Sequence, residues 1–216
     1  MTAMQASQGR WYPVTRSEEL VARHIVHAQL LGQELALWRD AAGRANAWEN
    51  RCPHRGVRLS IGSNDGRELR CRYHAWRFAS GTGQCTFLPA HPTQKPASTI
   101  KVLTYSVSEK YGYVWVGLGE VPAAPVEDRL EGRHITTLRS VFVDAPAATL
   151  AAAMHSAPPA SSEMRWLQPV DEARTVLHAA LLDVEPQMER LGLLRRQHIR
   201  MTGIRDVAEA RHRNPS

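Results

Sequence analysis

The 216-residue sequence predicts a mainly β protein, with an antiparallel β-sandwich or barrel first and a smaller α+β segment after it. Three observations predict this architecture. Short runs rich in β-branched and aromatic residues recur through residues 24–116, turn sequences separate them, and a helical apolar pattern appears only after residue 185. The hydrophobic fraction of 43% suffices for a packed core, and the charged fraction of 22% does not suggest disorder.

The strands expected in the first half follow one another closely. Residues 40–43 (Asp-Ala-Ala-Gly) and residues 81–83 (Gly-Thr-Gly) are turn sequences, and residues 64–66 (Asn-Asp-Gly) are a strong hairpin signal. Between these turns the sequence predicts strands at residues 24–31, 34–39, 45–49, 68–71, 100–107 and 113–116.

The composition changes after residue 119. Residues 121–125 contain two prolines and are typical of a linker, and residues 138–143 and 174–181 predict strands. Residues 145–162 are rich in Ala, Pro and Ser and give no clear prediction. A final helix is expected from about residue 185, with Asp183 as N-cap, Pro186 in the first turn, and an apolar face. That face is expected to carry Met188, Leu191 and Leu194.

The net charge of +6 is unevenly distributed, because residues 51–77 form a basic run with seven arginines and two acidic residues. This basic run either steers an acidic partner or is an ordinary solvated surface. It lacks a nucleic-acid-binding motif and interleaved aromatic residues, so no nucleic-acid partner is expected. The run contains only Asp65 and Glu68 against Arg51, Arg55, Arg58, Arg67, Arg70, Arg72 and Arg77.

Other features bear on location. No apolar run approaches the roughly 18 residues of a membrane span. The polar residues 1–10 lack the apolar core of a secretory signal. Three cysteines make a disulfide framework implausible. We therefore expect a cytoplasmic protein that does not bind membranes.

Two short segments hold the candidate metal ligands: Cys52-Pro-His54 and, after sixteen intervening residues, Cys71-Arg-Tyr-His74. Each offers one thiolate and one imidazole, and two such loops facing each other supply two cysteines for one iron and two histidines for another. That is the ligand set of a Rieske-type [2Fe–2S] cluster. A Cys₂His₂ zinc site is the main alternative, although a one-residue Cys-to-His gap is unusual for zinc. Cys85 lies outside both segments and is expected to be a buried structural thiol.

Four segments resemble the N-terminal domain of Rieske non-haem iron oxygenases over residues 10–119. They are residues 11–14 (Trp-Tyr-Pro-Val), 52–60, 71–76 and 111–116. The early Trp-Tyr-Pro is most similar to the monooxygenase and demethylase branch, of which vanillate demethylase is an example. The resemblance implies a sandwich of small antiparallel sheets, with the cluster at the tip of two hairpin loops.

By motif match, the resemblance places Cys52 and Cys71 on the inner iron and His54 and His74 on the outer iron. One position departs from the family pattern, which usually has Gly where this chain has Ala75. If that position needs a positive φ, alanine is strained there. The next residue, Trp76, either packs beneath the cluster or belongs to the core.

The second half departs further from the family. The oxygenases continue into a catalytic domain that holds a mononuclear iron by two histidines and a carboxylate. No two histidines here are four or five residues apart, and the Ser-Ala-Pro-Pro after His155 cannot continue a helix. Residues 134–212 are therefore expected to be a short α+β remnant of that domain, which is reduced or missing. Its histidines are His134, His155, His178, His198 and His212.

Three functions remain open. The first is an electron-transfer component, without catalytic residues, that accepts electrons from a reductase or ferredoxin and passes them to a separate catalytic oxygenase subunit in an oligomeric assembly. The second is a compact complete oxygenase whose iron is held by scattered residues such as His134, Asp144 and His155. The third is a redox-sensing or structural module.

Overall fold

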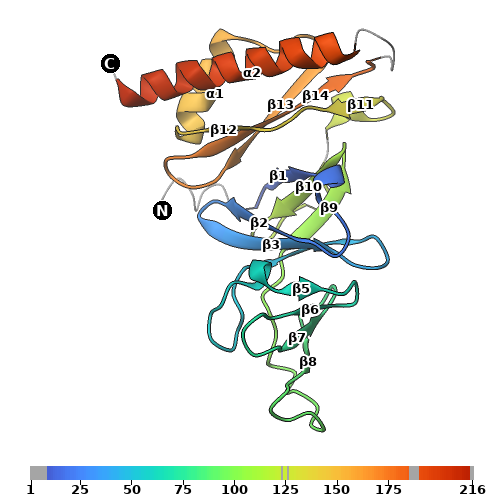
Figure 1. The fold of residues 1–216 in the computed structure, drawn as a ribbon. Helices are drawn as coiled ribbons and strands as arrows, with labels where there is room; N and C mark the ends of the chain where they lie inside the picture. The colour runs from blue at the N-terminus through green and yellow to red at the C-terminus, as the bar shows by residue number, and fades with distance from the viewer. Residues whose placement is uncertain (1–8, 123, 126, 185–189, 215–216) are drawn as a thin grey trace.

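The computed structural model describes residues 9–122, 124–125, 127–184 and 190–214. It is mainly β, as predicted, and its antiparallel sheets are stacked in layers with two helices at one end (Figure 1). Within the described residues, no helix has the length and apolar character needed to cross a bilayer.

Two three-stranded sheets pack face to face in the first half. One has the order β1-β10-β9 and the other the order β2-β3-β4. The core between them contains Val14, Leu35, Leu37, Val114 and Val116, so alternate residues of β3 and β10 face inward. The strands are β1 (Trp11–Arg16), β2 (Ile25–Leu30), β3 (Gln33–Arg39), β4 (Ala45–Glu49), β9 (Ser106–Lys110) and β10 (Tyr113–Gly117).

A third sheet lies at the end of the molecule opposite the helices (Figure 1). Its order is β5-β6-β7-β8, and the strands are β5 (Ser63–Asn64), β6 (Glu68–Arg70), β7 (Arg77–Ala79) and β8 (Cys85–Phe87). Phe78 and Leu69 join Trp38 and Trp48 in one core, where the two indoles meet edge to face at 5.0 Å. The predicted turns at residues 40–43, 64–66 and 81–83 all join paired strands.

The prediction of one strand over residues 100–107 is wrong in its bounds. Lys101 and Thr104 form only isolated bridges, because the chain crosses the edges of two different sheets there and has no continuous partner. The strand proper is β9, which pairs with β10 through the turn at Tyr111 and Gly112. Both turn residues have positive φ, as a two-residue hairpin with the right twist requires.

The C-terminal half is an α+β unit, made of one four-stranded sheet and two helices. Strand β14 (Thr175–Leu182) pairs with β13 (Glu163–Pro169) along one edge. Along its other edge it pairs in succession with β11 (Ile135–Thr137) and β12 (Val141–Val143). The helices α1 (Ala147–Ser156) and α2 (Arg190–Arg213) cover one face of this sheet, around Leu150, Met201 and Ile204.

Several predictions for this half need correction. The strand predicted at residues 138–143 is β12 alone, because the chain leaves the edge of β14 between β11 and β12. Residues 145–162 contain α1, which ends at Ser156 before the two prolines. Leu191 is 80% exposed and does not share the buried face of α2. Asp183 has φ 53 and accepts a bond from Arg133, and the predicted helix start around Met188 lies outside the described residues.

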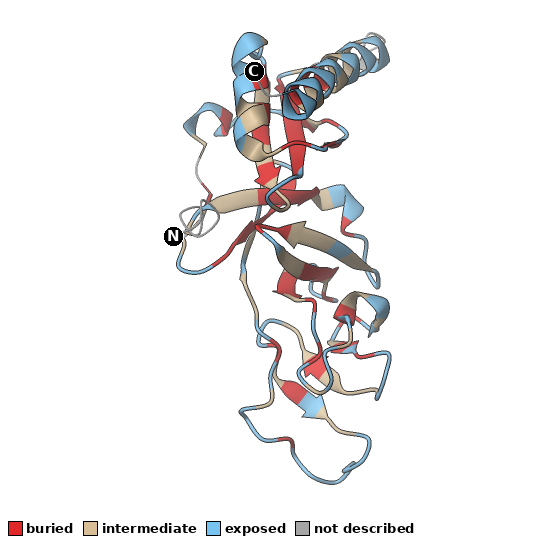
Figure 2. Ribbon diagram, turned by 90° about the vertical axis from the view of Figure 1, so that its left-hand side faces the viewer, coloured by how far each residue is buried: buried red, intermediate tan, exposed pale blue. Residues whose placement is uncertain are grey.

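The two halves share a buried junction. Tyr113 and Trp115 of β10 pack against Trp166 of β13, and the Tyr113 hydroxyl donates to the Ala179 carbonyl at 2.7 Å. Burial is concentrated along these strands, whereas much of the outer surface of α2 is exposed (Figure 2). The C-terminal sheet therefore completes the core of the first half on this side.

Candidate metal centre

Two loops of the same geometry carry the motif residues. The first loop (residues 52–57) follows β4, and the second loop (residues 71–76) joins β6 to β7. In each, the cysteine N–H donates to the carbonyl five residues later, from Cys52 to Val57 at 2.8 Å and from Cys71 to Trp76 at 2.9 Å. The two loops are therefore matched supports, each presenting a thiol at its start and an imidazole within it.

Each loop turns through a left-handed residue at its fifth position. Gly56 has φ +73 and Ala75 has φ +55. The expectation that Ala75 occupies a conformation suited to glycine is confirmed. A non-glycine residue in this region costs about 1–2 kcal/mol, and the closing bond of the second loop together with its β6–β7 pairing holds Ala75 there.

The two cysteines lie inside the core at the base of the loops. Cys52 is 2% exposed and Cys71 3%, and the two thiols are in hydrogen-bonding contact. Burial, followed by the neighbouring Cys71, raises the pKa of Cys52 to about 11. Such a pair holds the thiolate charge only when a cation compensates it, as a bound metal does.

The two histidines lie at the outer rim. His54 is half-buried and His74 is exposed. Their Nδ1 atoms face each other at 3.1 Å, and their ring centroids are 4.7 Å apart. Burial, then the neighbouring charges of His74 and Arg55, lowers the pKa of His54, which favours the neutral ring that a metal needs.

The donor set therefore consists of two pairs, thiols inside and imidazoles outside. This division fits a two-iron cluster in which each iron takes one pair. Among the residues that the structure describes, no three His, Cys, Asp or Glu side chains form a group able to hold a single metal ion.

Two aromatic side chains of the second loop flank the histidines. The Trp76 indole stacks on the His54 ring with centroids 4.2 Å apart and planes 9° apart. Tyr73 lies against His74 at 3.9 Å with planes tilted by 37°. The sequence alone did not decide whether Trp76 packs beneath the cluster or belongs to the core, and it did not predict the contact of Tyr73. The reason is that the motif does not specify which aromatic ring packs against which histidine.

Cys85 is buried, as expected, and its Sγ lies 3.8 Å from the Phe87 carbonyl oxygen. It shares the core of Cys52 and Cys71 but comes from β8 rather than from either loop. Burial raises the pKa of this thiol as well.

Six of the seven arginines of the basic run are exposed, and Arg77 is half-buried. Arg58 is paired with Glu34, and Arg77 lies 3.9 Å from Glu68. Arg55 and Arg72 flank the histidines in sequence and make no ion pair with any described residue. Both interpretations of the run, steering and simple solvation, remain consistent with this arrangement.

The scattered candidates for a second iron are not brought together. The His134 backbone meets Asp183 at the start of β11, and the Asp144 backbone meets Glu209 of α2. His155 is exposed on α1, where its ring contacts the Ala151 carbonyl. His178 is fully buried in β14, and His198 and His212 are exposed on α2.

Comparison with known proteins agrees with this geometry. The family model described as "Rieske [2Fe-2S] domain" matches residues 10–105. These residues are a Rieske [2Fe–2S] domain. The domain implies a Rieske-type cluster, and Rieske oxygenases, with demethylase and monooxygenase members, are among the relatives of the chain.

Two curated relatives illustrate the match. Oxidoreductase NdmD of Pseudomonas putida is 50% identical over 140 residues, which cover 63% of this chain and 24% of the relative. The 3-chlorobenzoate-3,4-dioxygenase oxygenase subunit of Comamonas testosteroni is 38% identical over 123 residues, or 56% of this chain and 28% of that protein. The chain thus spans about a quarter of the length of these relatives.

Solved structures share the fold over nearly the whole chain. Apo dicamba monooxygenase superposes with a TM-score of 0.81 at 18% identity, covering 96% of this chain and 87% of that one. NdmA of Pseudomonas putida CBB5 superposes with a TM-score of 0.72 at 20% identity, covering 93% and 81%. The likeness therefore includes the C-terminal sheet and helices as well as the Rieske domain.

Proposed function

We propose that Cys52, His54, Cys71 and His74 hold the Rieske-type cluster, and that the chain is the electron-transfer component of a ring-hydroxylating or demethylating oxygenase system. The observation that carries this proposal is the pair of matched loops, with thiols paired in the core and imidazoles paired at the rim. When bound, such a cluster takes up and releases one electron at a time.

The four proposed ligands differ in burial, and each pair has its own role. Cys52 and Cys71 anchor the inner iron where water is excluded, and the closing N–H bonds fix the loop backbone around them. His54 and His74 hold the outer iron at the surface, which is the side open to a partner protein. Trp76 fixes the plane of His54 by stacking on it.

The proposed partners are an electron donor and an electron acceptor. A reductase or ferredoxin supplies the electron, and a separate mononuclear-iron catalytic subunit receives it in a larger oligomeric assembly in the cytoplasm. The exposed Arg55 and Arg72 beside the rim support docking of an acidic protein surface. The relative that is 50% identical is named an oxidoreductase rather than an oxygenase subunit, which also supports a role in electron delivery.

One observation favours the alternative, a compact complete oxygenase. The fold likeness to dicamba monooxygenase extends through residues 134–212, which we otherwise interpret as a remnant of a catalytic domain behind the Rieske domain of residues 10–119. Iron content separates the two functions, because a complete oxygenase holds a third iron in addition to the pair in the cluster.

The ligand assignment is tested by anaerobic purification of four proteins. We expect the wild type and Cys85→Ser to contain equal amounts of iron and acid-labile sulfide and to give the spectrum of a Rieske cluster. His54→Ala and His74→Ala each remove an outer ligand and should lose or disorder the cluster, although both side chains are outside the core and the fold should remain. Stoichiometric zinc without sulfide in the wild type would refute the assignment.

A further inference from the structure

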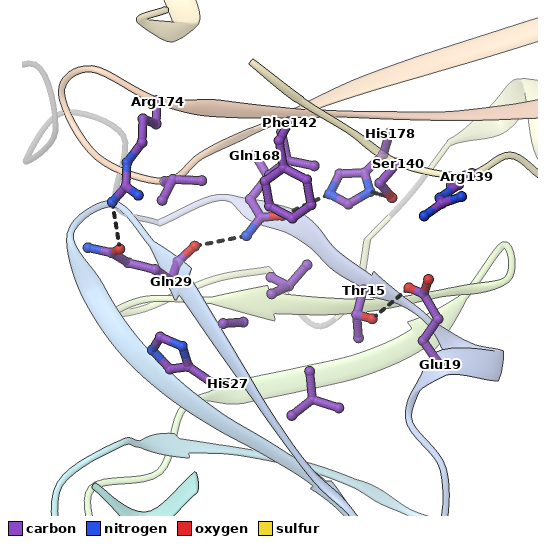
Figure 3. A pocket seen from close by; sticks show the side chains of 15 residues that line it. Thr15, Glu19, His27, Gln29, Arg139, Ser140, Phe142, Gln168, Arg174 and His178 are labelled. Atoms are coloured by element: carbon purple, nitrogen blue, oxygen red, sulfur yellow. Dashed lines mark hydrogen bonds between the residues drawn. The ribbon is translucent and has the colours of Figure 1, made fainter. Parts of the chain in front are cut away.

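A pocket of about 560 Å³ lies between the first strands of the chain and the C-terminal sheet (Figure 3). Its walls come from β1 and β2 on one side and from β12, β13 and β14 on the other. Small-molecule sites typically enclose about 300–1,000 Å³ and often form between structural units. The proposed iron ligands do not line this pocket, so it is a separate feature of the molecule.

Much of the pocket wall is apolar. Val14 and Val26 contribute from the first half, and Val170 and Val176 from the C-terminal half. Phe142 of β12 also lines the pocket, and it is 76% exposed, an unusual state for so large an apolar ring. A flat apolar ligand would cover this ring and remove it from water.

The buried polar groups of the pocket are already paired with one another. The Gln168 amide donates to the Gln29 carbonyl at 2.8 Å, so its oxygen is left to accept from His178 Nε2 at 2.8 Å. His178 Nδ1 then accepts from the Ser140 hydroxyl at 2.9 Å. This chain of bonds fixes a neutral His178.

The charges that line the pocket are balanced with one exception. Glu19 accepts from Arg16 at 2.7 Å and from Thr15 at 3.0 Å, and Arg174 donates to Asp171 at 2.9 Å. Arg139 lies at the same end as Glu19 (Figure 3), yet it makes no hydrogen bond or ion pair with any residue that the structure describes. One unpaired guanidinium therefore faces an otherwise apolar or internally satisfied pocket.

We propose that this pocket binds a small aromatic carboxylate, with its ring against Phe142 and its carboxylate on Arg139. The planar guanidinium fork matches a carboxylate and forms charge-assisted hydrogen bonds with it. A neutral ligand would leave the Arg139 charge uncompensated, and a cation would be repelled by it. This second site does not depend on the assignment of the cluster ligands.

The test is isothermal titration calorimetry on the cluster-loaded full chain with two matched probes, naphthalene-2-carboxylate and its neutral carboxamide. We expect saturable binding of the carboxylate, at least about tenfold tighter than that of the amide. Arg139→Gln should weaken the carboxylate to the level of the amide, and Phe142→Ala should weaken both probes. The control is Arg195→Gln, an exposed arginine on α2 outside the pocket, which should change nothing.

Three results would overturn the proposal: no saturable binding of the carboxylate, equal binding of carboxylate and amide, or unchanged carboxylate binding by Arg139→Gln. Arg139 and Phe142 are exposed, so both variants should fold, and an unchanged circular dichroism spectrum and iron content confirm that they do. Loss of the cluster in a His54→Ala protein should leave carboxylate binding intact, which separates this site from the proposed electron-transfer function.

Discussion

A single residue, Trp76, contacts both loops. Its backbone closes the second loop, while its indole stacks on His54 of the first at 4.2 Å. Under the proposed function it is a positioning residue, because the stack restricts rotation of a ring that binds the outer iron.

We predict that Trp76→Leu retains the cluster but shifts or broadens the electron paramagnetic resonance signal of the reduced protein, because His54 loses its fixed plane. Trp76→Phe keeps an aromatic face and should stay closer to the wild type. Trp11→Leu, on β1 and outside the loops, is the control and should leave the signal unchanged. Identical spectra for Trp76→Leu and the wild type would show that the stack does not position the ligand.

His178 is a buried histidine that the proposed mechanism does not use. Burial lowers its pKa to about 3, and of the two smaller effects Glu19 raises the pKa while Arg16 lowers it. The unfolded chain takes up a proton near pH 6.5 while the folded chain does not, so the unfolded state binds more protons between these two values. The contribution to stability is therefore fully present above pH 6.5 and falls as the pH decreases.

We predict that the free energy of unfolding falls by about 2 kcal/mol between pH 7 and pH 5 through this residue alone. Urea denaturation at a series of pH values measures it. His178→Asn should flatten the dependence in this interval, whereas His198→Gln, an exposed change on α2, should not alter it. A wild-type stability that is flat from pH 7 to pH 5 would contradict a neutral buried His178.

At the scale of the element, β14 explains the packing of the C-terminal half. All eight of its residues are buried. Leu177, Ala179 and Leu181 face the helices, whereas Ala180 and Leu182 face the first half of the chain. A strand covered on both faces has no polar alternation, which is why it reads as a continuous apolar run interrupted only by His178.

Helix α2 docks on this strand through a narrow face. Met201, Ile204 and Ala208 are buried at helical spacing, while Leu191 is exposed. We predict that Met201→Ala lowers the free energy of unfolding by roughly 2–5 kcal/mol, because it empties a fully buried site. Leu191→Ala should change it by no more than about 0.5 kcal/mol. Denaturant titrations of both variants measure this, and equal effects would contradict the observed face.

At the scale of the whole molecule, we predict that this chain alone does not oxidise an organic substrate. Chemically reduced protein, supplied with Fe(II) and aromatic methoxy or N-methyl compounds, should give no formaldehyde or hydroxylated product. The reason is that His134, Asp144 and His155 lie on separate parts of the C-terminal half. Dicamba monooxygenase assayed in parallel is the positive control. Product from this chain that disappears in Asp144→Ala or His155→Ala would favour the complete oxygenase.

The sequence alone determined the features that depend on local order. The spacing of Cys52, His54, Cys71 and His74 predicted the candidate ligands, and the alternating strands and turn residues predicted most of the first half. The family resemblance marked Ala75 as strained if its φ is positive, and the structure gives it a φ of 55°. These features lie in short segments whose conformation is fixed by neighbouring residues and closing backbone bonds.

The tertiary structure decided what depends on contacts between distant segments. It set the bounds of β9 and β12, the buried face of α2, the stacking of Trp76 on His54 and the environment of His178. It also formed the pocket, whose walls come from residues more than a hundred positions apart. The physical reason is that the partner of a side chain across a core is chosen by packing of whole sheets, which no local pattern records.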